Sequence, residues 1–114
     1  MNKYHAETTR IGKKKFASRK EARRYQELAY MQRAGRIYDL KRQVRYLLIP
    51  TQYDDEGNCM EYSCNYVADF VYKTRGGDLV VEDVKGYRGG QAYALFVIKR
   101  KLMLERYGIR VREV

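Results

Sequence analysis

Two segments with apolar residues at helical spacing, one on each side of a β-rich centre, restrict the folds open to this chain more than any other feature of its sequence. The first begins at Ser18, which forms an S-x-x-E capping box with Glu21, and a left-handed turn at Gly35 is expected to end it. The second runs from about Gln91 to Tyr107 and ends at Gly108. Helices in these two places are typical of an α/β domain, because each can cover part of a sheet.

The β-rich centre holds three strand candidates, and a fourth follows the second helix. They are residues 42–49, 65–72, 79–85 and 109–114. The turn-forming stretch from Lys73 to Asp78 is expected to join the second and third strands as a hairpin. The order is therefore α-β-β-β-α-β. It predicts an α/β domain whose four-stranded mixed sheet is flanked by two helices.

The chain is expected to form one domain, since its 114 residues contain neither an internal repeat nor a linker. Residues 1–15 are polar and end in three lysines, which predicts a mobile basic arm. No apolar run approaches the ~18 residues of a membrane span, and no signal peptide is recognisable. We therefore expect a cytoplasmic protein with no membrane partner. Cys59 and Cys64 lack the spacing of a zinc site and are expected to be reduced.

The net charge of +10 is unevenly distributed along the chain. Fourteen basic and four acidic residues lie within residues 1–46, so this segment carries the whole net charge. A one-sided basic field suits a polyanion. The sequence shows neither an amphipathic basic helix with aromatic membrane anchors nor an aromatic stacking motif for RNA. DNA is therefore the expected partner.

Eight basic side chains are the candidates for contacts with DNA phosphates. They are Lys13, Lys14, Lys15, Arg19, Arg23, Arg24, Lys99 and Lys101. The two lysines of the second helix are explained equally well by a solvated helix face.

The candidate chemistry lies on the predicted hairpin. Alternation places Asp83 and Lys85 on one face of their strand and Glu82 on the other. Pairing of the two strands would bring Asp69 near Asp83, and converging carboxylates repel each other unless a cation lies between them. Mg²⁺ needs only one or two carboxylates, and Lys85 could then position or deprotonate a metal-bound water. A bulge at this point would place Glu82, instead of Asp83, beside Asp69. The D-x-K pattern is also short enough to arise by chance.

These residues belong to a pattern that resembles the PD-(D/E)XK nuclease superfamily over nearly the whole chain. The segments that carry the resemblance are FASRKEARRY (Phe16–Tyr25), YVADFVY (Tyr66–Tyr72), VEDVKG (Val81–Gly86) and KRKL (Lys99–Leu102). Within that superfamily the chain is most similar to a group of small phage and prophage proteins catalogued as a domain of unknown function. The proline that names the motif is replaced by Ala68, and Asp83 stands where Glu is the common residue.

The resemblance implies a restriction-endonuclease-like core in which Asp69, Asp83 and Glu21 bind Mg²⁺ or Mn²⁺ and Lys85 is the catalytic lysine. Glu21 is also explained by the capping box alone. The implied activity is that of a metal-dependent endodeoxyribonuclease in a phage-infected or lysogenic bacterial host, with branched DNA such as Holliday junctions as the expected substrate class. Two matched sites on a two-fold junction would imply a homodimer. The alternative is a non-catalytic DNA-binding protein that keeps the nuclease fold.

Overall fold

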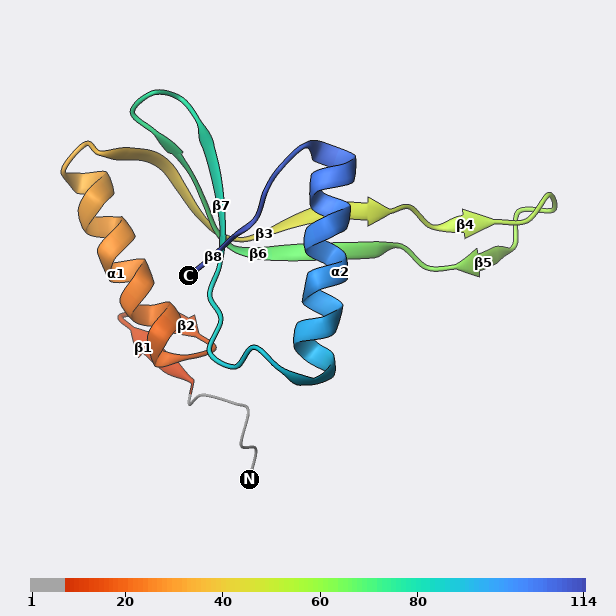
Figure 1. Ribbon diagram of the computed structural model, residues 1–114, viewed down its shortest axis with the longest axis horizontal. Coiled ribbons are helices and arrows are strands. Elements are labelled where there is room, and N and C mark those ends of the chain that lie inside the picture. The colour runs from red at the N-terminus through yellow and green to blue at the C-terminus, as the bar shows by residue number, and fades with distance from the viewer. Residues whose placement is uncertain (1–7) are drawn as a thin grey trace.

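A four-stranded mixed sheet forms the centre of the computed structural model, which describes residues 8–114 (Figure 1). Its strand order is β3-β6-β7-β8. The strands are β3 (Ile37–Ile49), β6 (Cys64–Thr74), β7 (Leu79–Asp83) and β8 (Arg112–Glu113). The first three are antiparallel neighbours and β8 lies parallel to β7. With the two helices α1 (Arg19–Arg33) and α2 (Gly90–Tyr107), this arrangement confirms the predicted α/β class.

Both helices begin and end close to the predicted residues. The hydroxyl of Ser18 accepts a hydrogen bond from the backbone N–H of Glu21 at 3.0 Å, which satisfies one of the unpaired donors of the first turn of α1. Gly35 follows α1 with φ 74°, and Gly108 ends α2 with φ 68°. Both glycines adopt the left-handed conformation that ends a helix without a steric penalty.

Two apolar clusters hold the helices against the sheet. The α1 core consists of Leu28, Ile37, Phe70, Tyr72 and Val80. The α2 core consists of Leu48, Tyr66, Ala68, Val71, Val81, Phe96, Met103 and Val111. Complete burial of Leu28 and Phe70, both 0% exposed, contributes about 1.5–3 kcal/mol for each side chain before entropy costs. β6 and β7 supply residues to both cores.

The ribbon of β3 and β6 bends sharply in the middle of its length (Figure 1). Ala68 belongs to the α2 core and Phe70 to the α1 core, although residues two apart in a regular strand share a face. Opposite the intervening Asp69 lies Gln43, whose φ of 52° is unusual for a residue with a side chain. The bend therefore falls at Asp69 and Gln43, and it re-aims the side chains on both sides of it.

Several elements differ from the sequence-based prediction. β3 begins at Ile37 instead of residue 42, β7 ends at Asp83, and β8 is only two residues long. The expected acidic loop closes a hairpin of β4 (Gln52–Tyr53) and β5 (Cys59–Glu61). Cys59 and Cys64 carry free thiols, as predicted.

Residues 9–16 include most of the described part of the predicted basic arm. They form a hairpin of β1 (Thr9–Ile11) and β2 (Lys14–Phe16), whereas residues 1–7 of the expected arm lie outside the described residues. Phe16 is 1% exposed, and the guanidinium of Arg42 lies 3.8 Å from the centroid of its ring. Arg42 also donates to the carbonyl oxygen of Lys15 at 2.8 Å. The hairpin is thus anchored by one aromatic side chain and one arginine. Within residues 8–114, no helix is long and apolar enough to cross a membrane.

Candidate active site

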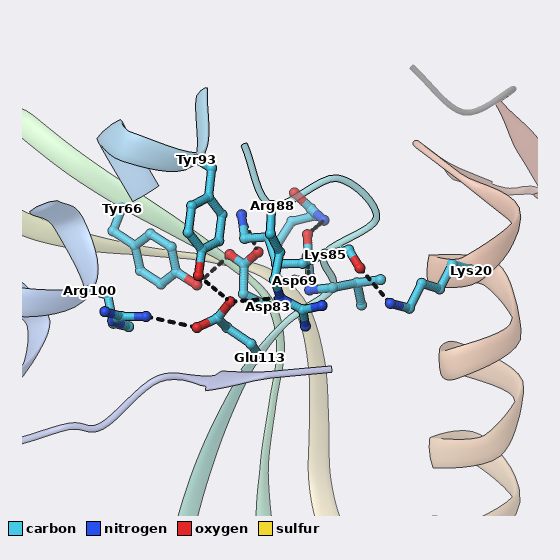
Figure 2. Close-up of polar contacts among 11 residues, drawn as sticks. Lys20, Tyr66, Asp69, Asp83, Lys85, Arg88, Tyr93, Arg100 and Glu113 are labelled. Carbon is cyan, nitrogen blue, oxygen red and sulfur yellow. Dashed lines mark hydrogen bonds and ion pairs between the residues drawn. The ribbon is translucent and has the colours of Figure 1, made fainter. Parts of the chain in front are cut away.

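Three different elements bring together the four side chains predicted for the site. Glu21 comes from the first turn of α1. Asp69 comes from the bend in β6, Asp83 from the end of β7, and Lys85 from the loop that follows (Figure 2). Phe70 pairs with Glu82, so one further step along the same register places Asp69 opposite Asp83. The hairpin thus has the register that the sequence suggested.

Gln43 joins the carboxylates of Glu21 and Asp69. Its side-chain amide nitrogen lies 3.3 Å from Oε2 of Glu21 and 3.3 Å from Oδ1 of Asp69. Burial, followed by repulsion from Asp69, raises the pKa of Glu21 to about 7, although Arg42 at 3.8 Å opposes the shift. The carboxylate of Glu21 therefore points to the sheet, while only its backbone N–H serves the helix cap.

Asp69 is held by both neighbouring strands. Its Oδ2 accepts a hydrogen bond of 2.7 Å from the backbone N–H of Val84, and its Oδ1 faces Gln43. Burial and then repulsion from Asp83 raise the pKa of Asp69 to about 6, against the opposing effect of these donors and of Lys85. Glu21 and Asp69 thus form a pair of carboxyl groups that resist holding two negative charges at once.

Asp83 and Lys85 form an ion pair in which each side chain has a second partner. The ammonium of Lys85 lies 2.8 Å from Oδ1 of Asp83 and 3.7 Å from the centroid of the Phe96 ring. The hydroxyl of Tyr66 donates to Oδ2 of Asp83 at 2.6 Å. Burial, followed by the charge of Asp83, raises the pKa of Tyr66, so the phenol remains a donor. Lys85 is therefore fixed in position beside the carboxylates.

Glu82 points to the opposite face of β7, as strand alternation predicts. It is 0% exposed and is paired with Arg24 through two hydrogen bonds of 2.8 and 2.6 Å. Tyr72 also donates its hydroxyl proton to this carboxylate. The geometry therefore favours Asp83 over Glu82 as the acid beside Asp69. It also gives Arg24, one of the predicted phosphate contacts, an intramolecular partner.

The backbone around Lys85 is tied down from two directions. On the β8 side, Lys85 N–H donates to the Val114 carbonyl and Val114 N–H donates to the Asp83 carbonyl, each at 2.9 Å. On the α1 side, the ammonium of Lys20 donates to the carbonyl oxygen of Lys85 (Figure 2). These bonds fix the start of the loop between β7 and α2.

Glu113 of β8 is the centre of a second polar cluster, next to the first. It accepts hydrogen bonds from Arg88 at 3.2 Å, Tyr93 at 2.9 Å and Arg100 at 2.7 Å (Figure 2). Burial acts to raise the pKa of Glu113, but the three donors together lower it. Because Arg88 lies in the loop after Lys85 and the other two donors on α2, Glu113 connects the loop to the helix.

The other predicted DNA contacts lie in three places. Lys13, Lys14 and Lys15 are in the β1–β2 hairpin, Arg19 and Arg23 are on α1, and Lys99 and Lys101 are on α2. Next to the site, Lys20, Arg23 and Arg112 line a pocket of about 820 Å³, together with further residues of α1, Val84 after β7 and Val114 beyond β8. Its charge makes it the most suitable place for a phosphate near the carboxylates.

Sequence reasoning missed Gln43 and Tyr66. Gln43 lies among Lys41, Arg42 and Arg45, so nothing in the sequence distinguishes it from its polar neighbours. The backbone conformation that turns it toward the carboxylates depends on the bend. Tyr66 was one of 12 tyrosines, and nothing in its neighbours along the chain marks it as the partner of Asp83.

The resemblance implies a divalent cation held by Glu21, Asp69 and Asp83. Within residues 8–114, no three His, Cys, Asp or Glu side chains converge closely enough to hold a metal ion. However, Glu21, Asp69 and Asp83 offer only oxygen donors, which hard cations such as Mg²⁺ prefer. Burial and mutual repulsion raise the pKa values of the first two, and a cation would relieve this repulsion. The three acids therefore suit a hard divalent ion in the type of their donor atoms and in their charge.

The fold and the site define a small mixed α/β protein with a buried acidic cluster beside a lysine. The chain belongs to the family described as "Protein of unknown function (DUF1064)", whose sequence profile matches residues 1–113. No curated protein and no solved structure matches the chain significantly.

Proposed function

We propose that this protein is a metal-dependent endodeoxyribonuclease of the PD-(D/E)XK type, which hydrolyses phosphodiester bonds in DNA, with branched DNA such as Holliday junctions as its substrate class. The observation that carries the proposal is the meeting of Glu21, Asp69, Asp83 and Lys85 from three separate elements. A structural ion pair needs one acid and one base. Here three acids stand against two bases, since Lys85 pairs with Asp83 and Arg42 lies 3.8 Å from Glu21, and the remaining negative charge suits a cation.

Glu21, Asp69 and Asp83 would hold Mg²⁺ or Mn²⁺ after a movement that brings the three carboxylates closer together. The ion, when bound, would supply charge neutralisation at the phosphate and lower the pKa of a water. Lys85 would stabilise the charge that develops on the phosphate or orient the attacking water. Its ammonium is fixed between Asp83 and Phe96, so little side-chain entropy would be lost when the substrate binds. Tyr66 holds Asp83 from the other side and acts as a positioning residue.

The basic surface beside the site supports a polyanionic substrate. Lys20, Arg23 and Arg112 line the pocket on the α1 side of the sheet, so a phosphate bound there would lie close to the backbone of Lys85. Contacts of this kind fix the position of the strand and carry no sequence information. The proposed enzyme would therefore recognise DNA by its shape and charge.

The test is cleavage of supercoiled plasmid and of a synthetic four-way junction, each with Mg²⁺, Mn²⁺ or EDTA. We expect cleavage with either metal and none with EDTA. Asp83→Asn should abolish it, and Lys85→Met, which keeps most of the packing of the stem, should slow it at least about a hundredfold. Asp78→Asn, at an exposed acid on the turn of the same hairpin, is the matched control and should cleave normally.

Binding to the same junction in EDTA separates loss of chemistry from loss of fold. Asp83→Asn and Asp78→Asn should bind it as tightly as the wild type or more tightly, since removal of a carboxylate lowers repulsion of the phosphates. Lys85→Met should still bind it but no more tightly than the wild type, since this variant removes a positive charge. Cleavage by Lys85→Met at the wild-type rate would refute the role of this lysine.

One observation favours the alternative, a DNA-binding protein without catalytic activity. Gln43 lies between Glu21 and Asp69, and Lys85 neutralises Asp83, so the cluster can be satisfied without a cation. If the wild type binds the junction, takes up no Mn²⁺ in calorimetry and cuts no DNA, this alternative replaces the enzyme.

A further inference from the structure

A two-stranded arm projects from the outer end of the sheet (Figure 1). We define the arm as residues 50–63, which include β4 and β5. Gln52 pairs with Glu61 and Tyr53 with Cys59, and each residue of the arm is exposed or half-exposed. The longest dimension of the molecule, 53 Å, lies horizontally in Figure 1, and the arm forms one end of it. The arm therefore contributes nothing to either core.

The arm carries large apolar side chains in water. Tyr53 is 64% exposed, Met60 63% and Tyr62 87%. Exposed apolar residues scattered singly are normal, but three on one short projecting ribbon are concentrated enough to mark an interaction surface. The exposed edges of the ribbon could also pair with strands of other chains, and a specific partner that covers them would prevent this.

The charge of the arm is opposite to that of the rest of the chain. Residues 46–72 contain no lysine or arginine, and the arm carries Asp54, Asp55, Glu56 and Glu61 in a protein of net charge +10. The tip has a defined shape, because Asp54 accepts hydrogen bonds from the backbone N–H groups of Glu56 and Asn58 at 2.9 and 2.8 Å. An acidic tip would be repelled by nucleic acid. The charge instead suits a basic protein surface.

The outward face of α2 offers such a surface on the same protein. Leu95 and Ile98, one turn apart, are 52% and 56% exposed, although they lie on a helix that packs against the sheet. Lys99 follows Leu95 by four positions and Lys101 follows Ile98 by three, so each lysine flanks one of these apolar side chains. The face of α2 is apolar and basic, whereas the arm is apolar and acidic.

We propose that two copies of this chain form a dimer in which the arm of each copy lies across α2 of the other. The arm extends away from α2 of its own chain in Figure 1, so a second copy is needed to bring the two surfaces together. A two-fold axis would make both contacts at once, as in most symmetric dimers. This proposal rests on surface chemistry and is independent of the proposed nuclease activity.

The first test measures mass in solution by sedimentation velocity at several concentrations. The wild type should sediment as a species of twice the 13.6 kDa chain mass. The double variant Asp55→Lys/Glu56→Lys should weaken the dimer at least about tenfold, since like charges would then face each other. Asp78→Lys, at an exposed acid on the turn between β6 and β7, is the matched control and should leave the dimer unchanged.

Complementation tests the partner surface. Lys99→Glu/Lys101→Glu should also be monomeric alone, but mixing it with the arm double variant should restore a dimer of one copy of each. This outcome is expected only if the two surfaces meet. Circular dichroism of each variant confirms the fold. Two monomeric variants that do not combine would refute the pairing, as would a wild type that stays monomeric at about 100 µM, where even a weak specific dimer is populated.

Crosslinking locates the contact without disturbing charge. Cys59 is exposed on β5 of the arm, so Ile98→Cys should give a dimer linked by a disulfide under mild oxidation. Tyr30→Cys, at a position 62% exposed on α1, should give none above the wild-type background. If the arm double variant instead tightens DNA binding while the mass stays that of a monomer, the arm faces DNA and the dimer proposal fails.

Discussion

Arg24 provides the clearest test of the packing between α1 and the sheet. Its guanidinium makes two hydrogen bonds to Glu82, a residue 58 positions away in sequence, and this carboxylate is completely buried. We expect that Arg24→Met, which keeps most of the volume of the side chain, strongly destabilises the protein, because it leaves a buried charge without its counterion.

The expected loss in the free energy of unfolding is large because Glu82 is completely buried, whereas Arg24 is partly exposed. Removal of one partner from a buried ion pair costs about 3–5 kcal/mol, and the hydroxyl of Tyr72, which still donates to Glu82, favours the lower end of this range. With an unfolding entropy of about 2.1 cal/mol/K per residue, 114 residues give about 240 cal/mol/K, so the midpoint should fall by about 12–20 °C. Glu82→Gln should cost much less, since Arg24 is 23% exposed and can be hydrated.

Thermal and urea unfolding of the two single variants and the double variant form a mutant cycle. The double variant Arg24→Met/Glu82→Gln should recover at least half of the loss seen in Arg24→Met, because the uncompensated charge is gone. A loss below about 1 kcal/mol in Arg24→Met, the value of an exposed pair, would show that Glu82 is not the buried charge described above.

Three further predictions concern the site and its surroundings. In EDTA, the raised pKa of Glu21 means that the wild type should lose stability as the pH rises from 4.5 to about 7, and Asp69 adds to this loss up to about pH 6. Glu21→Gln should reduce the slope, most clearly above pH 6, and melt higher than the wild type at pH 8; equal slopes would contradict the prediction. Arg23→Glu should weaken DNA binding for all sequences and reduce its salt dependence, measured by fluorescence anisotropy, whereas Arg33→Glu at the far end of α1 should change both less. The free energy of unfolding of Gln43→Gly should exceed that of Gln43→Ala by at least about 1 kcal/mol, because only glycine adopts φ 52° without strain. Equal free energies of unfolding would argue against a left-handed Gln43.

The local features of the fold were predictable from sequence. The helix ends are set by the backbone and side-chain preferences of single residues, namely Ser18, Gly35 and Gly108. These preferences depend little on contacts with distant parts of the chain. The turn before Leu79 similarly sets the register of β6 and β7, which determines that Asp69 faces Asp83. Strand alternation then separates Glu82 from the site.

The features that were not predictable depend on contacts between distant segments. Nothing near Arg24 indicates that it pairs with Glu82, so it was assigned to DNA on charge alone. The bend at Gln43 needs two helices packed on different parts of one strand pair, and no local propensity encodes it. The β1–β2 hairpin is polar apart from Phe16 and Ile11, and its anchor on Arg42 comes from another element.

The contribution of β6 to both cores determines which parts of the protein can unfold separately. Tyr66 and Ala68 pack with α2, whereas Phe70 and Tyr72 pack with α1, so neither helix can leave without exposing part of the same strand. Amide hydrogens at the centre of β6 should therefore exchange with solvent only through global unfolding, while those of the helix ends exchange through local fraying. Asp69 lies on this most slowly exchanging segment, so its position would persist through fluctuations that loosen the rest of the surface.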